Sequence, residues 1–307
     1  TIGPPEFPGN VCASTRNNGW DFFNMNASVI LEMHPLQSSI TFLDVGQGDC
    51  IYIKSRQGNC YLIDGGSTSV SEVGKYRIIP FLKYKGAGVL EAVIITHPDE
   101  DHINGIMELL EEGRQEGIQV KNVILPQIEQ RQKNAAYEEI EQIVQNAGIP
   151  IYYINSGEGI KEESMQLRCV NPKLGTFYEE ENAYSVVLEL KECGFKALLT
   201  GDAEGMGEKV LLQEYAGQTD CEMDVLKVAH HGSKNSTSDE LLKALKPDVA
   251  IISCGKNNVY GHPHKETIKR LEAADSSIFT TAEQGAITVR VAEKIKIMSF
   301  ADEKGEQ

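Results

Sequence analysis

Short runs of apolar and β-branched residues, separated by polar or glycine-containing turns, recur along the chain from residue 39 onward. Such runs predict β-strands, whereas apolar residues spaced three and four apart predict helices. Strands are predicted over residues 39–44, 50–54, 60–64, 92–95, 122–125, 151–154, 165–170, 184–191, 195–200, 224–229, 248–253, 287–291 and 294–300. Helices are predicted over residues 103–110, 135–146, 205–215, 239–245 and 265–274.

The order of these elements predicts an α/β fold. Three neighbouring strands open the series at 39–64, and a second group of three follows at 165–200, with helices alternating with strands after each group. This order indicates two similar halves, each a sheet with helices on its outer face. We expect one domain over residues 39–300, a linker or loosely organised lead-in over 1–38, and a tail over 301–307.

Four side chains able to bind a metal come directly after the strand predicted at 92–95, where residues 96–102 read Thr-His-Pro-Asp-Glu-Asp-His. Pro98 favours an extended conformation at the residue before it, so His97 and Asp99 are expected to project to the same side. Asp101 and His102 come at the first helical turn. One short segment can therefore supply two adjacent metal positions. The alternative, a surface loop in which Asp101 caps the helix, suits a single polar residue better than four.

The remaining histidines follow the same pattern. Six of the seven lie where an apolar strand gives way to a loop, namely His97, His102, His230, His231, His262 and His264. Asp202 ends a further strand, and its two oxygens suit bridging two cations. Asp64 ends another and is suited either to capping or to supporting a metal ligand. Strand ends gathered along one edge would bring these groups together.

Composition limits the range of functions. Among 307 residues, 29 basic and 45 acidic side chains give a formal charge of −16, which argues against non-specific attraction to nucleic acid or to anionic membranes. An anionic substrate must be held locally, and residues 227–270 carry eight Lys or Arg against four Asp or Glu. No apolar run approaches the ~20 residues that span a bilayer, so this chain is expected to be soluble. The seven cysteines, without a Cys-x-x-Cys pair, fit reduced thiols in the core.

The order of the polar motifs resembles the metallo-β-lactamase superfamily. These motifs are Asp-Gly-Gly at 64–66, His-x-Asp-x-Asp-His at 97–102, Thr-Gly-Asp at 200–202 and His-His-Gly at 230–232. The family's usual central motif is His-x-His-x-Asp-His, so Asp99 replaces a histidine. The resemblance covers about residues 39–300. It implies a four-layer αββα sandwich with a two-metal site on one edge.

Three further motifs resemble, more narrowly, the C-terminal soluble domain of the ComEC family of DNA-uptake (competence) proteins. They read Leu-Asp-Val-Gly-Gln-Gly-Asp at 43–49, Ala-His-His-Gly-Ser at 229–233 and Tyr-Gly-His-Pro-His at 260–264. Proteins of that family have membrane-spanning segments. The resemblance thus implies a part of a cell-membrane protein on the outer face of the membrane, with DNA as substrate and the membrane-spanning portion of the same protein as partner.

The superfamily resemblance also implies the metal ligands, which are His97, Asp99, Asp101, His102, Asp202 and His231. His97 and Asp99 would hold one ion, and Asp101 and His102 the other. Asp202 would bridge the two ions. His230 is a rival of His231, and whichever is not a ligand would face the substrate. No histidine occurs from Ile103 to Ala229, where the family places another ligand, and Asn182 and Ser185 lie near that place without being equivalent. This carboxylate-rich set shifts the preference from zinc toward manganese or magnesium.

The predicted function is that of a metal-dependent hydrolase with two divalent ions, Mn²⁺ or Zn²⁺, with Mg²⁺ as a third option. Two cations ~3.5–4 Å apart activate a shared water and stabilise an in-line displacement, so the predicted nucleophile is a metal-bound hydroxide. Asp101 would orient it, and His230 or His262 would bind a phosphoryl oxygen or protonate the leaving group. His262 and His264 are alternatively turn residues that satisfy backbone groups.

The leading hypothesis for the substrate is DNA, cut as a phosphodiesterase or nuclease during DNA uptake. A second hypothesis keeps the fold and the metals but assigns a small phosphodiester of the phosphocholine type, which the acidic charge makes credible. A third is a domain that binds or gates DNA without cutting it, and the missing ligand motivates it.

Overall fold

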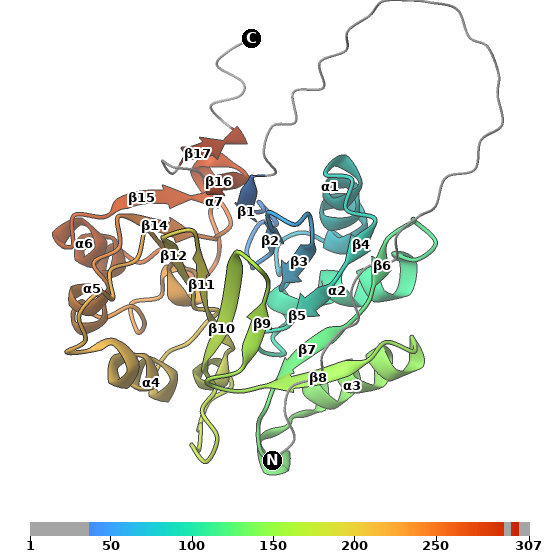
Figure 1. The fold of residues 1–307 in the computed structure, drawn as a ribbon, viewed down its shortest axis with the longest axis horizontal. Coiled ribbons are helices and arrows are strands. Elements are labelled where there is room, and N and C mark those ends of the chain that lie inside the picture. The colour runs from blue at the N-terminus through green and yellow to red at the C-terminus, as the bar shows by residue number, and fades with distance from the viewer. Residues whose placement is uncertain (1–36, 292–295, 301–307) are drawn as a thin grey trace, which may run out of the picture. The chain divides into compact units, whose positions relative to one another are not determined.

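Two β-sheets packed face to face, with helices on their outer sides, make up the structure, a computed structural model that describes residues 37–291 and 296–300 (Figure 1). The predicted lead-in up to residue 36 and the tail at 301–307 lie outside the described residues, so the domain bounds stay predictions. The predicted strands and helices are present, with bounds that agree within three residues.

The first sheet has eight strands. Their spatial order is β17 (Lys296–Ser299), β16 (Ile287–Val291), β1 (Ser38–Phe42), β2 (Ile51–Lys54), β3 (Cys60–Ile63), β5 (Ala92–Ile94), β7 (Val123–Pro126) and β8 (Ile151–Ile154). From β3 to β8 the strands run parallel. The last two strands of the chain pair beside β1, so the end of the chain completes the sheet that its beginning starts. The sequence pattern did not indicate this pairing.

The second sheet has seven strands. Their spatial order is β15 (Ser277–Thr280), β14 (Val249–Ile252), β13 (Val225–Lys227), β12 (Phe195–Leu199), β11 (Val187–Glu192), β10 (Met165–Asn171) and β9 (Gly159–Lys161). The strands from β12 to β15 run parallel. The sequence pattern missed β9 and β15, which are short and only partly buried.

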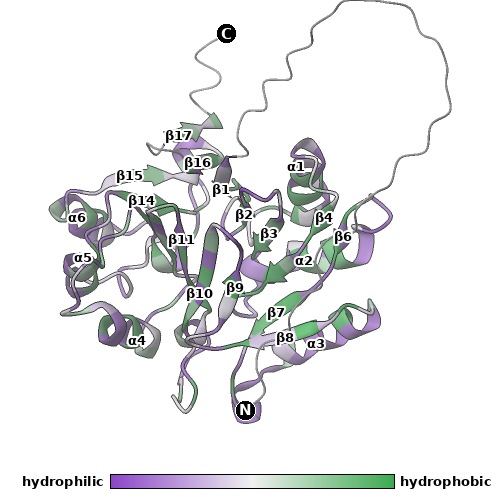
Figure 2. Ribbon diagram, in the orientation of Figure 1, coloured by the Kyte–Doolittle hydropathy of each residue, from purple (hydrophilic) through white to green (hydrophobic). Residues whose placement is uncertain are grey.

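Alternation along the strands divides the apolar residues between three layers of core. In β12, Ala197 and Leu199 pack in the core between the two sheets, whereas Leu198 packs in the core beneath the helices. In β5, Ile94 lies between the sheets and Val93 on the helical side. The apolar colouring of the strands and the more polar outer sides of the helices are visible in Figure 2.

Helices cover both outer faces. The first sheet carries α1 (Ile79–Tyr84), α2 (Glu100–Glu112) and α3 (Ala135–Asn146), and the second carries α4 (Met206–Tyr215), α5 (Asp239–Leu245) and α6 (Lys265–Ala273). Two smaller elements complete the fold, α7 (Thr281–Gln284) and the ribbon of β4 (Val89–Leu90) with β6 (Gln119–Val120). The predicted αββα sandwich is therefore confirmed. None of the described helices has the length and apolar character needed to cross a membrane.

Cysteines of the described residues are all free thiols, as predicted. Five of them are buried, but Cys193 is exposed at the turn between β11 and β12, so its assignment to core packing is wrong. Cys12 lies outside the described residues.

Backbone contacts dock the loops that follow β1 and β3 onto the first turn of α2. The amide of Asp49 donates to the carbonyl of Asp101 (3.0 Å), and the amide of Gly65 donates to that of His102 (2.8 Å). A Cβ atom on Gly66 would collide with the backbone of His102 and Asp101, so glycine permits this close approach.

We predict that Gly66→Ala lowers the free energy of unfolding by about 1–3 kcal/mol, because the added methyl must push the loop and α2 apart. Gly88→Ala is the matched control, since a Cβ there would meet nothing closer than 3.5 Å. Urea unfolding followed by circular dichroism measures both. Equal stability of the two variants would contradict the close packing described.

Candidate metal centre

The carboxyl ends of the parallel strands of both sheets bring the polar motifs to one edge of the sandwich. His97 follows β5, Asp202 follows β12 and His231 follows β13. Asp101 and His102 lie in the first turn of α2. Segments more than a hundred residues apart in sequence therefore converge because parallel strands end at the same edge.

A buried quartet forms the centre of this convergence. Asp49, His102, Asp202 and His231 each offer a ligand atom, and these atoms all lie within 4.8 Å of one another. Asp101 lies beside them, with its Oδ2 atom 3.2 Å from Nε2 of His231. Asp49 was not among the predicted ligands, whereas the other four residues were.

His102 is oriented by Asp64. The Nδ1 atom of His102 donates to Oδ2 of Asp64 (2.8 Å), because a carboxylate can only accept. Asp64 also accepts from the amide (2.8 Å) and the hydroxyl (2.7 Å) of Thr96. The ring is thus fixed with Nε2 toward the centre, 3.4 Å from Oδ2 of Asp202. Of the two roles expected for Asp64, the contacts favour support of a ligand.

His231 is held in the same way by a backbone carbonyl. Its Nδ1 atom donates to the carbonyl of Ser253 (2.9 Å), which leaves Nε2 3.3 Å from Oδ2 of Asp202. His230 is less buried, its Nδ1 atom lies 3.0 Å from Oε2 of Glu204, and its Nε2 atom is 3.9 Å from Asp202. This geometry favours His231 over His230 as a ligand.

The backbone at these two histidines is strained. His230 and His231 have φ values of 48° and 53°, in the left-handed region that residues with a Cβ rarely adopt. Such conformations cost on the order of 1–3 kcal/mol each and cluster at functional sites. This backbone directs the imidazole of His231 into the centre and that of His230 toward the rim of the centre, beside Glu204.

His97 and Asp99 form a pair beside the quartet. The hydroxyl of Thr96 donates to Asp64, so Nδ1 of His97 must donate to that hydroxyl (3.0 Å). Nε2 of His97 then lies 3.4 Å from Oδ2 of Asp99, and the rings of His97 and His102 are 4.1 Å apart. Asp99, not Asp101, takes the N-cap position of α2, without a side-chain capping bond. The alternative in which Asp101 caps the helix is wrong.

The donor set fits divalent cations. The Nε2 atoms of His97, His102 and His231 are buried, and none has a hydrogen-bond partner among the residues that the structure describes. Each faces a carboxylate oxygen at 3.2–3.4 Å. A buried polar atom without a partner is costly, and a cation between these imidazoles and carboxylates would satisfy both.

The charges of the buried residues also fit a site for cations. Burial opposes a charge on His231, but Asp202, Asp49 and Asp101 outweigh it and raise the pKa of that imidazole to about 10. Burial likewise opposes the charge of Asp101, yet His231 and His102 hold the pKa of its carboxyl at about 2. The carboxyl of Asp101 therefore stays charged, and in the protein without an ion the protonated imidazole of His231 balances it.

Lys227 is a second residue of this centre that the sequence reasoning missed. Its side chain is fully buried at the end of β13, forms an ion pair with Asp49 and lies 3.5 Å from Oδ1 of Asp202. Its Nζ atom also donates to the carbonyl of Gly201 (2.8 Å). A lysine inside the apolar run at 225–229 was the available signal, because a buried ammonium needs a carboxylate partner.

The Gly-His-Pro-His turn lies at the rim. The ring of His262 is 5.5 Å from that of His230 and 6.2 Å from that of His231. Burial, together with the positive charge of His231 and His230, lowers the pKa of His262 to about 4. His264 instead accepts a hydrogen bond from the backbone amide of Lys234 (3.2 Å). The turn-residue interpretation therefore suits His264, whereas His262 faces the centre.

The two residues expected near the place of the absent histidine, Asn182 and Ser185, lie beside His230 and Asp202. Asn182 Nδ2 is 3.4 Å from Nδ1 of His230, and the hydroxyl of Ser185 accepts from the amide of Asp202 (3.3 Å). Neither brings an imidazole to the centre. The first pair, His97 with Asp99, thus remains poorer in nitrogen than the quartet.

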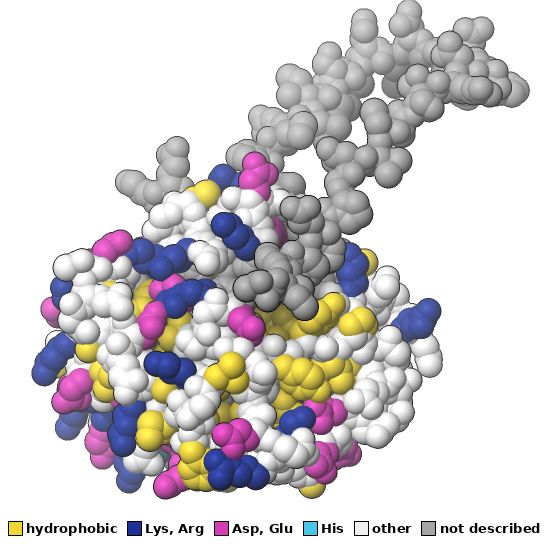
Figure 3. Space-filling model, turned by 60° about the horizontal axis from the view of Figure 1, so that its bottom comes forward, with side chains coloured by type: hydrophobic (Ala, Val, Ile, Leu, Met, Phe, Trp, Pro, Cys, Tyr) yellow, Lys and Arg dark blue, Asp and Glu magenta, His cyan; other side chains and the backbone are white. Residues whose placement is uncertain are grey.

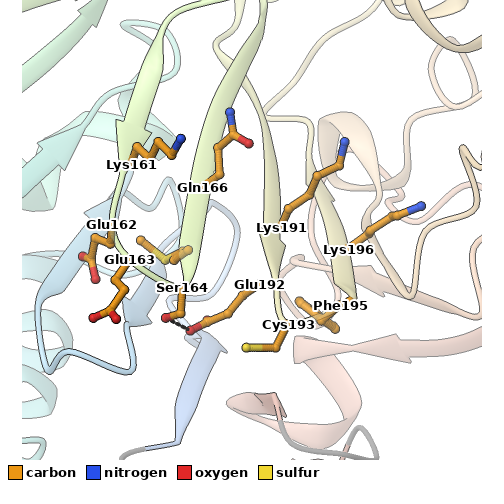
Figure 4. A pocket seen from close by; sticks show the side chains of 12 residues that line it. Lys161, Glu162, Glu163, Ser164, Gln166, Lys191, Glu192, Cys193, Phe195 and Lys196 are labelled. Atoms are coloured by element: carbon orange, nitrogen blue, oxygen red, sulfur yellow. Dashed lines mark hydrogen bonds between the residues drawn. The ribbon is translucent and has the colours of Figure 1, made fainter. Parts of the chain in front are cut away.

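A separate cavity of about 300 Å³ lies at the other end of the second sheet, where β10 and β12 begin and β11 ends (Figure 4). Its wall carries charges of both signs, among them Glu163, Lys191 and Lys196. The hydroxyl of Ser164 donates to Glu192 (2.9 Å) across it. It contains no histidine, so the chemistry expected of the chain belongs to the other edge.

The family model described as the metallo-beta-lactamase superfamily matches residues 43–139 and 183–256. The chain belongs to the metallo-beta-lactamase superfamily. The predicted family is thereby confirmed, and the matched residues include all six predicted ligands.

Curated relatives, among them one named a competence protein, support the narrower resemblance to DNA-uptake proteins. ComE operon protein 3 of Bacillus subtilis is 31% identical over 88% of this chain and 35% of the relative. Recombination protein 2 of Haemophilus influenzae is 32% identical over 80% and 28%, and Competence protein ComA of Neisseria gonorrhoeae is 26% identical over 82% and 32%. The chain thus spans about a third of the length of these relatives.

Solved structures share the superfamily fold at low identity. The metallo-beta-lactamase fold protein YhfI of Bacillus subtilis is 11% identical, with a TM-score of 0.55 over 83% of this chain and 100% of that protein. CmlA, a diiron beta-hydroxylase of Streptomyces venezuelae, is 14% identical, with a TM-score of 0.54 over 84% and 55%. Such identities show the fold alone, and reactions other than hydrolysis occur on it.

We predict that Lys227→Met, measured with metal removed by a chelator, lowers the free energy of unfolding by about 3–5 kcal/mol, because it leaves buried carboxylates without their cation. Combining it with Asp49→Leu should recover part of the loss. Lys246→Met is the control, since Lys246 pairs with Glu222 at the exposed surface and should matter by less than about 1 kcal/mol. Urea denaturation decides the matter, and equal losses in the two single variants would refute the buried pairing.

Proposed function

We propose that the chain is a metal-dependent phosphodiesterase that cuts DNA during DNA uptake. The observation that carries the proposal is the convergence of three buried imidazole nitrogens, without hydrogen-bond partners among the described residues, with the carboxylates of Asp99, Asp101 and Asp202. Membership of the superfamily adds a fold on which two-metal sites occur, as in the diiron protein CmlA.

The residues divide between two ion positions. Asp101, His102 and His231 would hold one divalent ion, His97 and Asp99 would hold the other, and Asp202 would serve both. When bound, two such ions supply an activated water and stabilise the charge that develops on a phosphoryl group. Asp49 remains paired with Lys227, so we do not assign it to either ion.

Protein groups at the rim complete the proposed chemistry. Asp101 lies beside His231 and is placed to orient the attacking water. His230, steadied by Glu204, and His262, whose buried Nδ1 atom lacks a partner among the described residues, face the side from which a substrate would enter. We assign them to the phosphoryl oxygens and the leaving group.

DNA is the favoured substrate for two reasons. Competence proteins are among the relatives, and the carboxylate-rich donor set suits the hard cations used for phosphate chemistry. We further propose that the chain is a domain of a longer membrane protein, held on the outer face of the membrane beside that protein's membrane-spanning portion. The one-third coverage of the relatives supports a larger whole.

We predict that Asp202→Ala reduces cleavage of single-stranded and duplex DNA with Mn²⁺ by about 100-fold or more, since the centre loses the carboxylate that lies within 3.4 Å of Nε2 of both His102 and His231. Asp220→Ala is the control, because Asp220 is exposed and pairs with Lys196, which lines the cavity at the other end of the second sheet. Gel assays of initial rates measure both. Absence of cleavage with every divalent ion, or equal rates in the two variants, would defeat the proposal.

A comparison of substrates separates DNA from a small phosphodiester, which the net charge of −16 keeps as the second candidate. Under the proposal, oligonucleotides turn over faster than a phosphocholine ester or bis-nitrophenyl phosphate. The reverse order would assign the site to small phosphodiesters. DNA binding with no hydrolysis of any of them would indicate a binding or gating domain.

The carboxylate of Asp99, where the usual superfamily motif has a histidine, predicts a specific response to metals. Asp99→His restores the usual superfamily motif, so the ratio of zinc to manganese affinity should rise by about tenfold or more. Asp220→His tests whether any added imidazole has this effect. Elemental analysis after dialysis against both ions measures the ratio, and an unchanged ratio would place Asp99 outside the centre.

A further inference from the structure

The loop from Gly255 to His264 is a braced structure at the rim of the candidate centre. The side chain of Asn258 donates to the carbonyls of Gly255 (2.9 Å) and His262 (2.6 Å) and accepts from the amide of His262 (2.9 Å). The amide of Gly255 donates to Gln47 (3.1 Å), and that of His264 donates to the carbonyl of Gly232 (2.9 Å). The loop is therefore tied at both ends and across its middle.

This braced loop exposes two apolar side chains. Tyr260 has 51% of its surface exposed and Val259 has 93%. The Tyr260 ring is stacked on the imidazole of His262, with the centroids 5.8 Å apart and the planes 21° apart. One face of an aromatic ring is thus fixed in orientation by its neighbour, while much of the ring stays open to solvent.

His262 links this ring to the candidate centre. Its imidazole lies 5.5 Å from that of His230 and 6.2 Å from that of His231. Exposed lysines flank the loop, with Lys256 at its start, Lys265 just after it and Lys234 beside His264. An anionic strand at the centre would meet positive charge here, although Lys and Arg side chains lie among acidic ones elsewhere, as on the face in Figure 3.

We propose that Tyr260 is a stacking platform for the base of an unpaired nucleotide whose phosphodiester lies at the metal centre. The inference rests on the proposed function and adds a substrate class, single-stranded DNA or an unpaired end. An aromatic ring held rigid beside cations is the arrangement by which proteins bind single strands without reading their sequence. Bases inside a duplex are stacked on one another and do not offer a free face.

The test is the binding of a short thymidine strand with non-hydrolysable phosphonate linkages, followed by fluorescence anisotropy with Mn²⁺ present. A strand of the same length without bases gives the comparison. The unsubstituted chain is expected to prefer the strand with bases. Tyr260→Ala should weaken binding of that strand by about 5- to 100-fold, the range that stacking of one base gives, and leave the baseless strand unaffected.

Two further variants sharpen the test. Tyr260→Phe keeps the ring and should bind like the unsubstituted chain. Tyr84→Ala removes a tyrosine that is 84% exposed at the end of α1, before the start of β5, whereas the centre lies beyond the other end of that strand, and should change nothing. Equal binding of both strands by the unsubstituted chain, or unchanged binding after Tyr260→Ala, would overturn the platform. Equal weakening for both strands would also overturn it and point to a phosphate contact or another partner.

The result is separable from that of the proposed function. Cleavage of ordinary DNA that persists in Tyr260→Ala with unchanged binding would refute the platform and leave the phosphodiesterase intact. Base-dependent binding that needs Tyr260, in a chain that cuts no phosphodiester, would support the platform and defeat the proposed activity.

Discussion

Negative charge buried at one edge of the sandwich is the constraint on which the rest of the centre depends. Asp49, Asp64 and Asp202 are almost completely buried, and Asp101 lies beside them. Carboxylates out of water persist only with cations or several hydrogen-bond donors. The protein supplies both, through Lys227, through imidazoles and through the donors of Thr96, and the remaining capacity suits divalent ions.

The fold meets this constraint through its backbone more than through its side chains. Parallel strands of both sheets end at the same edge, and the loop around Asp49 docks on α2 through amide-to-carbonyl contacts. The imidazoles proposed as ligands are each held by one ring nitrogen, at Asp64 for His102 and at Ser253 for His231. The other nitrogen of each ring is thus aimed at the candidate centre without an ion, which is the preorganisation that a metal site would require.

Lys227 gives the centre an asymmetry that a simple two-metal site lacks. Its ammonium occupies the side of Asp202 toward Asp49, whereas the other oxygen of Asp202 faces His102 and His231. A fixed positive charge therefore stands where a third cation would otherwise be attracted. The missing histidine lowers the nitrogen content of the proposed donor set, and this departure favours hard, oxygen-binding ions in the proposed centre.

The sequence by itself determined the strands, the helices and most of the residues at the centre. Periodicity predicted α3, α5 and β8 with their observed bounds, and motifs that follow buried strands identified His97, Asp101, His102, Asp202 and His231 as neighbours. These predictions agree with the structure because the alternation of apolar residues and the identity of the residues after a strand are local properties of the chain.

Only the tertiary structure decided the rest. The pairing of β16 with β1 and of Lys227 with Asp49 depends on packing between distant segments. A left-handed backbone places His231, rather than His230, against Asp101 and Asp202. Sequence spacing carries no information about which buried charges meet, because that is fixed by how two sheets align.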